Sequence, residues 1–312
     1  DESNLSAFKA LLHSLCTRGA VCHKTLSLSS SRVTHRGIFS CCSVGEGEIL
    51  LRIPLSCCFI VSHSPSKIDE DQVPGATLEW ICRLAGNLSE EILKGEASAH
   101  YDYLQTLPKC PAQNLCCWSN ETIALFGNQN LEHVACGWKQ IRQLCTHYIR
   151  QVYGLRPEAG ECRDQYDLLQ ASLQGIELER SRSASSSFLS AEHIVDLIIS
   201  RAVKLRHSGG CVVRALVPIF DLLNHGVPNV CYSLVDGVAV EVRALRAIHP
   251  NEELLCDYGL SVEKSLLHHG FLPPEGACFE IELHHGEQML LRPEGPLSFD
   301  GSGSVPSLVI NG

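Results

Sequence analysis

The sequence predicts an α+β fold in which a long helical block separates two groups of short strands. Short apolar runs with turn residues fill the first quarter of the chain, and they return after Gly210. Between them, from about Leu78 to Tyr153, apolar residues recur every three or four positions, which is the period of an α-helix. Strands and helices therefore do not alternate as in a doubly wound α/β protein. No strand leads into G-x-G-x-x-G, so a dinucleotide site is not supported.

The composition indicates a folded protein and argues against several classes. Hydrophobic residues make up 45% of the 312 residues and charged residues 19%, which is too apolar a balance for intrinsic disorder. The net charge of −10 does not suit a protein that binds a nucleic-acid backbone. The apolar stretch from Ile49 to Val61 is interrupted by Arg52 and Pro54, so we expect no membrane-spanning helix. Because no signal segment begins at Asp1, we expect a trimmed or processed soluble monomer of the cytoplasm or nucleus.

The 17 cysteines do not form a recognisable metal or disulfide pattern. None of them stands in a C-x-x-C pair, which is the spacing that lets one turn direct two thiolates at a zinc ion. Their odd number and the missing signal segment argue against a disulfide framework. We therefore expect reduced, mostly buried thiols and no metal.

The strands are predicted from short apolar runs bounded by turns. Gly37–Phe39 and Ile49–Pro54 are expected strands, and the proline ends the second of them. Near the other end, Tyr232–Val235 and Val238–Val242 flank Asp236-Gly237, a strong hairpin turn. In the second hairpin strand, alternation predicts one buried face, made of Val238, Val240 and Val242.

Two helices are predicted with clear ends. A stripe of apolar residues runs through 131–152, and Gly154 ends that helix. A second helix is expected from Ala191 to about Leu205, with Ser190 as its N-cap. Its apolar face contains Arg201, which is an unusual position for a charge and marks a candidate functional residue.

Polar side chains interrupt two apolar segments that read as core strands, 217–225 and 251–259. Asp221, Asn224 and His225 lie among apolar residues in the first segment. Burying such groups without partners costs about 1–3 kcal/mol each. Taken alone, the pattern favours a strand end whose polar groups hold neighbouring turns, and a ligand site is the alternative.

With the rest of the chain, these segments resemble SET-domain methyltransferases, in the subfamily of Rubisco large-subunit lysine methyltransferase and actin-histidine methyltransferase. Five motifs occur in the family's order and cover nearly the whole chain. The resemblance implies a SET fold of short β-sheets with a knot-like C-terminal threading, interrupted by a helical insertion. The motifs are His35–Phe39 with Gly47–Pro54; Leu104–Pro108 with Trp118-Ser119 and Leu125-Phe126; Ser200-Arg201; Asp221–His225; and Glu252–Leu254 with Tyr258-Gly259 and Gly270-Phe271.

The resemblance implies an S-adenosylmethionine site whose first part is the opening turn. Thr34, His35 and Arg36 would contact the cofactor mainly through their backbone, and Gly37 would let the chain approach it closely. Arg201 would bind the carboxylate end of the cofactor, which accounts for a charge on an apolar helix face.

The second part of the implied site lies near the end of the domain. Asp221 belongs to the implied cofactor pocket, and Asn224 and His225 would bind the amino-acid and adenine portions of the cofactor. Phe271 would offer an aromatic face to the adenine. His269 stands where the family places a variable residue that touches the cofactor.

Tyr258 is the predicted catalytic residue, and it would also contact the cofactor. Methyl transfer from a sulfonium to an amine is a direct displacement, so the enzyme mainly aligns the two groups and excludes water. A free lysine amine has a pKa of about 10.4, and desolvation beside a cation lowers it. A phenol hydroxyl can then orient the neutral amine.

The chain departs from the family pattern near its C-terminal end. Between Tyr258 and Phe271 the family usually has one more residue and an Asn, and the segment 259–264 of this chain lacks both. The helical substrate-binding lobe that follows in the family is expected to be truncated here, with only its start at 276–312. The zinc-binding cysteine clusters of histone-type SET domains are missing from the sequence. The predicted domain limits are 1–76 for the first part of the SET domain, 77–189 for the insertion, 190–275 for the second part and 276–312 for the start of the C-terminal region.

The resemblance implies a protein-lysine N-methyltransferase that acts on a histone or another protein, without direct nucleic-acid binding. Histidine methylation is the first alternative, although the actin-histidine enzyme has an Asn and a Trp where this chain has Val203 and Phe220. The second alternative is a SET-like scaffold that binds a protein without catalysis, because a fold alone does not establish a function.

Overall fold

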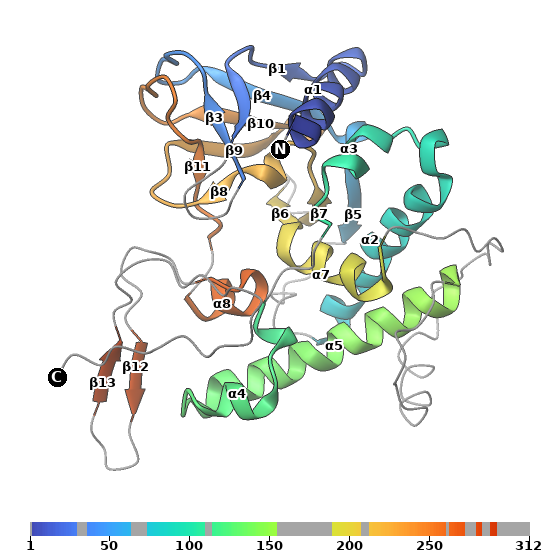
Figure 1. The fold of residues 1–312 in the computed structure, drawn as a ribbon, viewed down its shortest axis with the longest axis vertical. Coiled ribbons are helices and arrows are strands. Elements are labelled where there is room, and N and C mark those ends of the chain that lie inside the picture. The colour runs from blue at the N-terminus through green and yellow to red at the C-terminus, as the bar shows by residue number, and fades with distance from the viewer. Residues whose placement is uncertain are drawn as a thin grey trace.

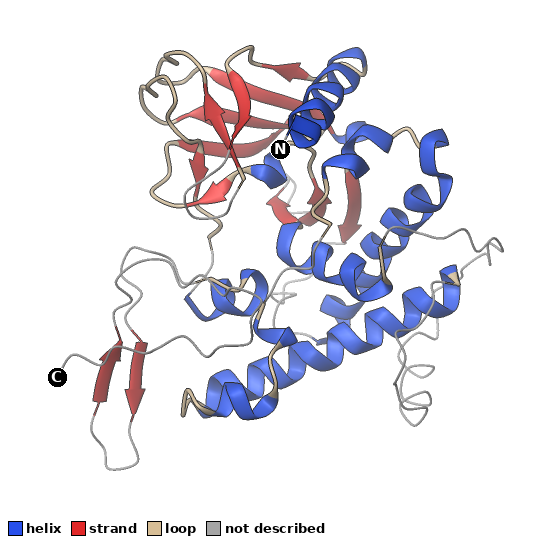
Figure 2. Ribbon diagram, viewed as in Figure 1, coloured by secondary structure: helices blue, strands red, loops and turns tan. Residues whose placement is uncertain are grey.

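The computed structural model describes residues 2–29, 36–63, 74–109, 114–154, 189–206, 212–259, 262–271, 279–282 and 288–291. Most strands lie together at one end of the molecule, and the long helices of the middle segment lie at the other (Figures 1 and 2). The helices are α1 (Glu2–Thr17), α2 (Pro74–Lys94), α3 (Tyr101–Thr106), α4 (Asn120–Ala124), α5 (Gln129–Tyr153), α7 (Ala191–Arg201) and α8 (Val262–His269), with short 3-10 turns at Leu55–Cys57, Gly95–Ala97, Leu115–Cys117 (η4) and Phe220–Leu222 (η5).

The strands form several small sheets rather than one large one, as the sequence predicts. The largest is antiparallel, with the order β1-β4-β10-β9, and a three-stranded sheet has the order β5-β7-β6. Three two-stranded sheets pair β2 with β3, β8 with β11 and β12 with β13. The strands are β1 (Val21–Cys22), β2 (Leu26–Ser29), β3 (Gly37–Ser40), β4 (Ile49–Pro54), β5 (Phe59–His63), β6 (Val203–Arg206), β7 (Val212–Leu216), β8 (Asn224–His225), β9 (Val230–Val235), β10 (Ala239–Ala244), β11 (Leu255–Cys256), β12 (Phe279–Glu282) and β13 (Gln288–Leu291).

The predicted hairpin is present, but the predicted burial of its second strand is partly wrong. Asp236 and Gly237 both have positive φ, as a tight hairpin turn requires. Val238 is 59% exposed because it lies in the turn, whereas Glu241 is only 3% exposed. Strand β10 pairs with β4 on one side and β9 on the other, and the carboxylate of Glu241 accepts a hydrogen bond from Arg243 Nε at 2.6 Å. A central, covered strand buries residues on both faces.

Both predicted helices form, and the end of the second differs from the expectation. Gly154 adopts the left-handed conformation after α5, and the hydroxyl of Ser190 accepts from the His193 N–H at the start of α7. Helix α7 ends at Arg201, so Leu205 lies in β6 rather than in the helix. The following residues pair with β7 across a sheet, a long-range contact that outweighs the local helical period.

The buried hydrophobic side chains form two separate clusters. The main core joins the sheets to α1, α2, α5 and α7. A second core joins the first part of the insertion to α8, and its fully buried members are Leu115, Cys116, Ile123, Leu131, Ala135, Leu266 and Leu267. The insertion is therefore packed against both the sheets and the last described helix.

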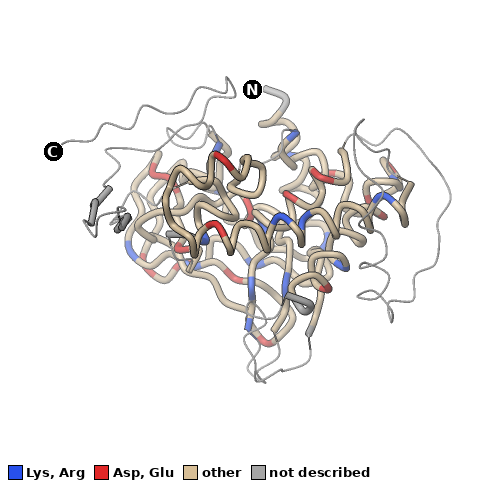
Figure 3. The backbone as a smooth tube through the Cα atoms, turned by 90° about the horizontal axis from the view of Figure 1, so that it is seen from below, with Lys and Arg blue, Asp and Glu red and all other residues tan. Residues whose placement is uncertain are grey.

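Charges and cysteines are distributed without a specialised cluster in the described ranges. Acidic and basic residues are interspersed over the tube in Figure 3. All 13 cysteines within the described ranges are free thiols, and no group of three or more His, Cys, Asp or Glu side chains there could hold a metal ion. Among the helices that the structure describes, none combines the length and the apolar character needed to cross a bilayer.

Candidate active site

The two polar segments singled out in the sequence lie side by side. Strand β8 pairs in parallel with β11, with Asn224 opposite Leu255 and His225 opposite Cys256. This pairing brings the end of β11 to β8, where the Tyr258 N–H donates to His225 Nδ1 at 3.2 Å. The polar groups of both segments therefore belong to one site.

Gly37 lets the opening strand β3 approach this pair of strands. A Cβ atom at Gly37 would lie 2.2 Å from Glu253 Oε1 and 2.8 Å from Asn224 Nδ2. Asn224 Nδ2 donates to Glu253 Oε1 at 2.6 Å and to the carbonyl of Arg36 at 2.9 Å. Sequence reasoning missed Glu253 as a site residue, although the motif Glu252–Leu254 contains it.

Arg201, at the end of α7, is held against Asp221 of η5. Arg201 Nη1 donates to the Asp221 carbonyl at 2.5 Å and lies 3.6 Å from Asp221 Oδ2. Tyr103 of α3 donates its hydroxyl hydrogen to the same Oδ2 at 2.9 Å. The Asp221 side chain is 1% exposed, and burial raises its pKa while Arg201 opposes that shift. Tyr103 gave no sequence signal, because 118 residues separate it from Asp221.

Two buried polar atoms of this ion pair have no hydrogen-bond partner among the described residues. They are Arg201 Nε, a donor, and Asp221 Oδ1, an acceptor. Leaving such atoms unpaired is costly in a folded protein, and in functional sites they commonly serve a ligand. Arg36 belongs to the same site, because its carbonyl accepts from Asn224 and its Nη1 donates to the Thr106 carbonyl at 2.6 Å. Burial, and after it the charge of Arg201, lowers the pKa of its guanidinium.

Four aromatic rings cluster beside the ion pair. The Tyr258 ring centroid lies 5.3 Å from His225, 4.9 Å from His269 and 6.3 Å from Phe271, and the His225 and Phe271 centroids are 5.7 Å apart. The Tyr258 hydroxyl donates to the Leu223 carbonyl at 2.7 Å. Burial raises the pKa of Tyr258, so its phenol is neutral at physiological pH. Burial also lowers the pKa of His269 to about 3, which leaves its imidazole uncharged.

The structure brings together nine of the eleven predicted site residues. They are linked by the contacts above, from Arg36 and Gly37 through Arg201, Asp221, Asn224 and His225 to Tyr258, His269 and Phe271. Thr34 and His35 lie outside the described residues. The role of each residue remains a prediction.

The carboxylate of Glu252 holds the loop that contains Glu253, and its titration can be measured. Glu252 accepts from Arg246 Nη2 at 2.6 Å, from Asn229 Nδ2 at 3.1 Å and from the His249 N–H at 2.8 Å. These contacts lower the pKa of Glu252 from 4.5 to about 2, and the hydrogen bond from Arg246 has the largest effect. A carboxyl with a depressed pKa in the folded state stabilises the protein above the unfolded pKa, and that stabilisation is lost as the pH falls toward 2.

We therefore expect the free energy of unfolding to decrease more steeply from pH 5 to pH 2 in the wild type than in Glu252→Gln. Urea unfolding of both proteins at several pH values measures the difference. Parallel pH profiles of the two proteins would show that the Glu252 contacts do not form.

The comparisons with known proteins agree with this geometry. A family model of the SET domain matches residues 35–259, which is more than half of the chain. The chain belongs to the SET-domain family. The predicted α+β SET fold is thus confirmed, while the knot-like threading and the domain limits remain predictions.

Solved structures show the same fold at low sequence identity. The SET domain of LSMT bound to lysine and AdoHcy matches with a TM-score of 0.57 and 15% identity, covering 86% of this chain and 58% of that one. Rubisco LSMT bound to AdoMet matches with a TM-score of 0.55 and 16% identity, covering 86% and 57%. This SET domain therefore spans less than two thirds of the length of either structure. A search of curated proteins gave no significant match.

Proposed function

We propose that this SET domain is an S-adenosylmethionine-dependent protein-lysine N-methyltransferase. The observation that carries the proposal is the position of Tyr258, a neutral phenol that packs with His225 and His269 and feels the charges of Arg201 and Asp221. The similar LSMT structures support the same proposal, since one of them is bound to AdoMet and another to lysine and AdoHcy.

The described residues fit S-adenosylmethionine in three respects. The unpartnered Arg201 Nε and Asp221 Oδ1 offer a donor and an acceptor of opposite charge, which suit the carboxylate and ammonium of an amino acid. The rings of His225 and Phe271 offer faces against which a purine can stack. Gly37 keeps the backbone of β3 close to Asn224 without a side chain in the way.

In the proposed reaction the protein aligns the groups and removes water. S-adenosylmethionine supplies, when bound, an electrophilic methyl group on a sulfonium. The surrounding rings cover part of the Tyr258 side chain, and desolvation favours the neutral form of a lysine amine, which has the lone pair needed for attack. The Tyr258 hydroxyl, already fixed by the Leu223 carbonyl, can orient that amine.

The partner and the compartment are part of the same proposal. The substrate would be a protein with an accessible lysine, and the net charge of −10 favours a basic segment such as a histone tail. We further propose that the protein acts as a monomer in the cytoplasm or the nucleus and does not bind nucleic acid directly.

The proposal is tested by offering the protein and methyl-labelled S-adenosylmethionine to a whole-cell extract. We expect label in one or a few proteins, and mass spectrometry should place it on lysine. An extract without added protein is the control. Label on histidine would instead establish the imidazole alternative, and cofactor binding without any transfer would favour the non-catalytic scaffold.

A further inference from the structure

Helix α8 carries His269 and lies next to the insertion. Two of its residues, Leu266 and Leu267, are fully buried in the second core, whose other buried members all come from residues 115–135. The thiol of Cys116 in η4 donates to the Leu267 carbonyl at 3.8 Å. The insertion thus provides the surface on which this helix rests.

Trp138 of α5 connects α8 with both cores. Its side chain packs against the main core and against the second core. Its ring also meets His268 edge-on, with the centroids 4.4 Å apart. His268 directly precedes His269, whose ring faces Tyr258. A change in the position of Trp138 would therefore reach the aromatic cluster through two adjacent residues of α8.

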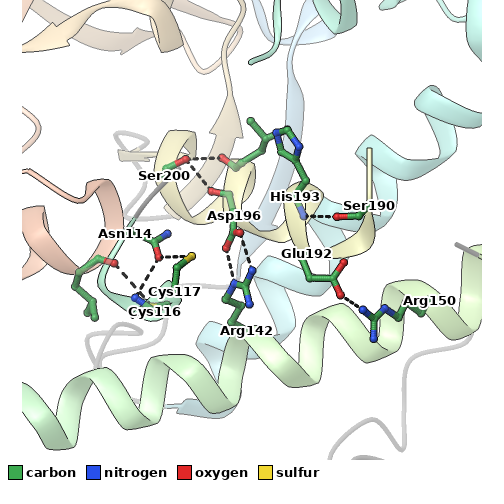
Figure 4. A network of polar contacts seen from close by, with 12 residues as sticks. Asn114, Cys116, Cys117, Arg142, Arg150, Ser190, Glu192, His193, Asp196 and Ser200 are labelled. Carbon is green, nitrogen blue, oxygen red and sulfur yellow. Dashed lines mark hydrogen bonds and ion pairs between the residues drawn. The ribbon is translucent and has the colours of Figure 1, made fainter. Parts of the chain in front are cut away.

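Arg142, one turn further along α5, connects the same helix with α7. Its Nε and Nη2 donate to the two carboxylate oxygens of Asp196 at 2.6 and 2.8 Å, as Figure 4 shows. Asp196 is 0% exposed, so the pair is shielded from solvent on the carboxylate side. Arg150 forms a second ion pair with Glu192 at the other end of α7. Helix α7 ends at Arg201, so α5 holds the element that supplies Arg201 to the pair with Asp221.

We propose that Trp138 and Arg142 are positioning residues that set the spacing between the two walls of the site, α7 with Arg201 and α8 with His269. Residues i and i+4 lie on the same face of a helix, so a single rigid helix fixes both walls at once. Neither residue is among the groups assigned above to the cofactor. The effect on ligand affinity rests on the proposed function, whereas the effect on α8 does not.

Hydrogen exchange in the ligand-free protein tests the positioning directly. In Trp138→Ala we expect the amides of α8 to exchange at least about tenfold faster than in the wild type, because the helix loses the indole ring against which His268 packs. Trp138→Phe, which keeps an aromatic ring, should restore most of the protection. The matched control is Ile149→Ala, which removes buried volume from the far end of α5 in the main core and should leave α8 unchanged.

Calorimetry with S-adenosylhomocysteine adds a second readout, at a temperature where circular dichroism shows each variant to be folded. Trp138→Ala should weaken binding about tenfold or more, and Ile149→Ala less than about twofold. Arg142→Lys, which keeps the charge but cannot form two parallel hydrogen bonds, should weaken binding and leave α8 exchange unchanged. If Trp138→Ala does not fold, Trp138→Leu takes its place.

The two readouts separate the possible failures. Unchanged α8 exchange in the Trp138 variant, or an equal change in Ile149→Ala, would overturn the role of Trp138. Unchanged affinity in Arg142→Lys would overturn the role of Arg142. A wild-type protein that binds no S-adenosylhomocysteine would contradict the proposed function instead, and the exchange experiment would still decide whether α5 holds α8.

Discussion

Replacing Tyr258 by Phe is expected to lower the methyl-transfer rate about tenfold or more, because a hydrogen bond to a reacting group contributes roughly this much. The substitution removes the hydroxyl and keeps the ring that packs against His225 and His269. Affinity for S-adenosylmethionine should therefore change little. Turnover under saturating cofactor, together with calorimetry, measures the two effects separately.

The matched control for this variant is Tyr153→Phe. The Tyr153 hydroxyl is also buried and donates to Glu90 Oε1 at 3.3 Å, but it lies at the end of α5 in the main core. Its removal should leave turnover unchanged. An unchanged rate in Tyr258→Phe would remove Tyr258 from the mechanism, and an equal loss in both variants would indicate a general effect of removing a buried hydroxyl.

Replacing Arg201 by Leu is expected to reduce the free energy of unfolding by about 3–5 kcal/mol, the cost of leaving a buried charge without its partner. The charge in question is Asp221, whose side chain is 1% exposed and would retain the hydroxyl of Tyr103 and the weaker attraction of the Arg36 charge. Urea unfolding at neutral pH measures the loss. Arg83→Leu is the control, because the pair of Arg83 with Glu79 is exposed and such pairs contribute about 1 kcal/mol or less.

The loss in Arg201→Leu should also depend on pH. Burial already raises the pKa of Asp221 above 3.8, and removing the guanidinium raises it further. The penalty is then absent below the unfolded pKa, where the carboxyl is protonated in both states, and it is complete above the folded pKa. A loss as small as that of Arg83→Leu, or one that does not change with pH, would contradict the buried ion pair.

Much of the site was predictable because its residues break local patterns. Arg201 is a charge on an apolar helix face, and Asn224, His225 and Tyr258 interrupt apolar runs. Each departure has an energetic cost that a purely structural segment rarely carries. The structure places these residues together. The local patterns alone did not predict this proximity, which was implied only by the resemblance to a known family.

The remaining features depended on contacts between distant parts of the chain. Glu252 and Glu253 are adjacent and chemically identical, so the sequence does not show which of them reaches the site. In the folded protein Glu252 accepts from Arg246 and Glu253 accepts from Asn224. The end of α7 at Arg201 was misplaced because the next residues pair with β7. Glu241 is buried because its strand is central in a sheet, which an alternating pattern does not reveal.

The central claim is that the strands β3, β8 and β11 and the helix α7 converge to hold S-adenosylmethionine with its sulfur directed at Tyr258. A crystal structure of the protein with S-adenosylhomocysteine tests this most directly. We predict that the amino-acid end of the ligand contacts Arg201, that its purine lies against His225 or Phe271, and that its sulfur faces the Tyr258 hydroxyl. A ligand bound elsewhere, or a site in which these side chains remain packed against one another with the ligand in excess, would contradict the assignment.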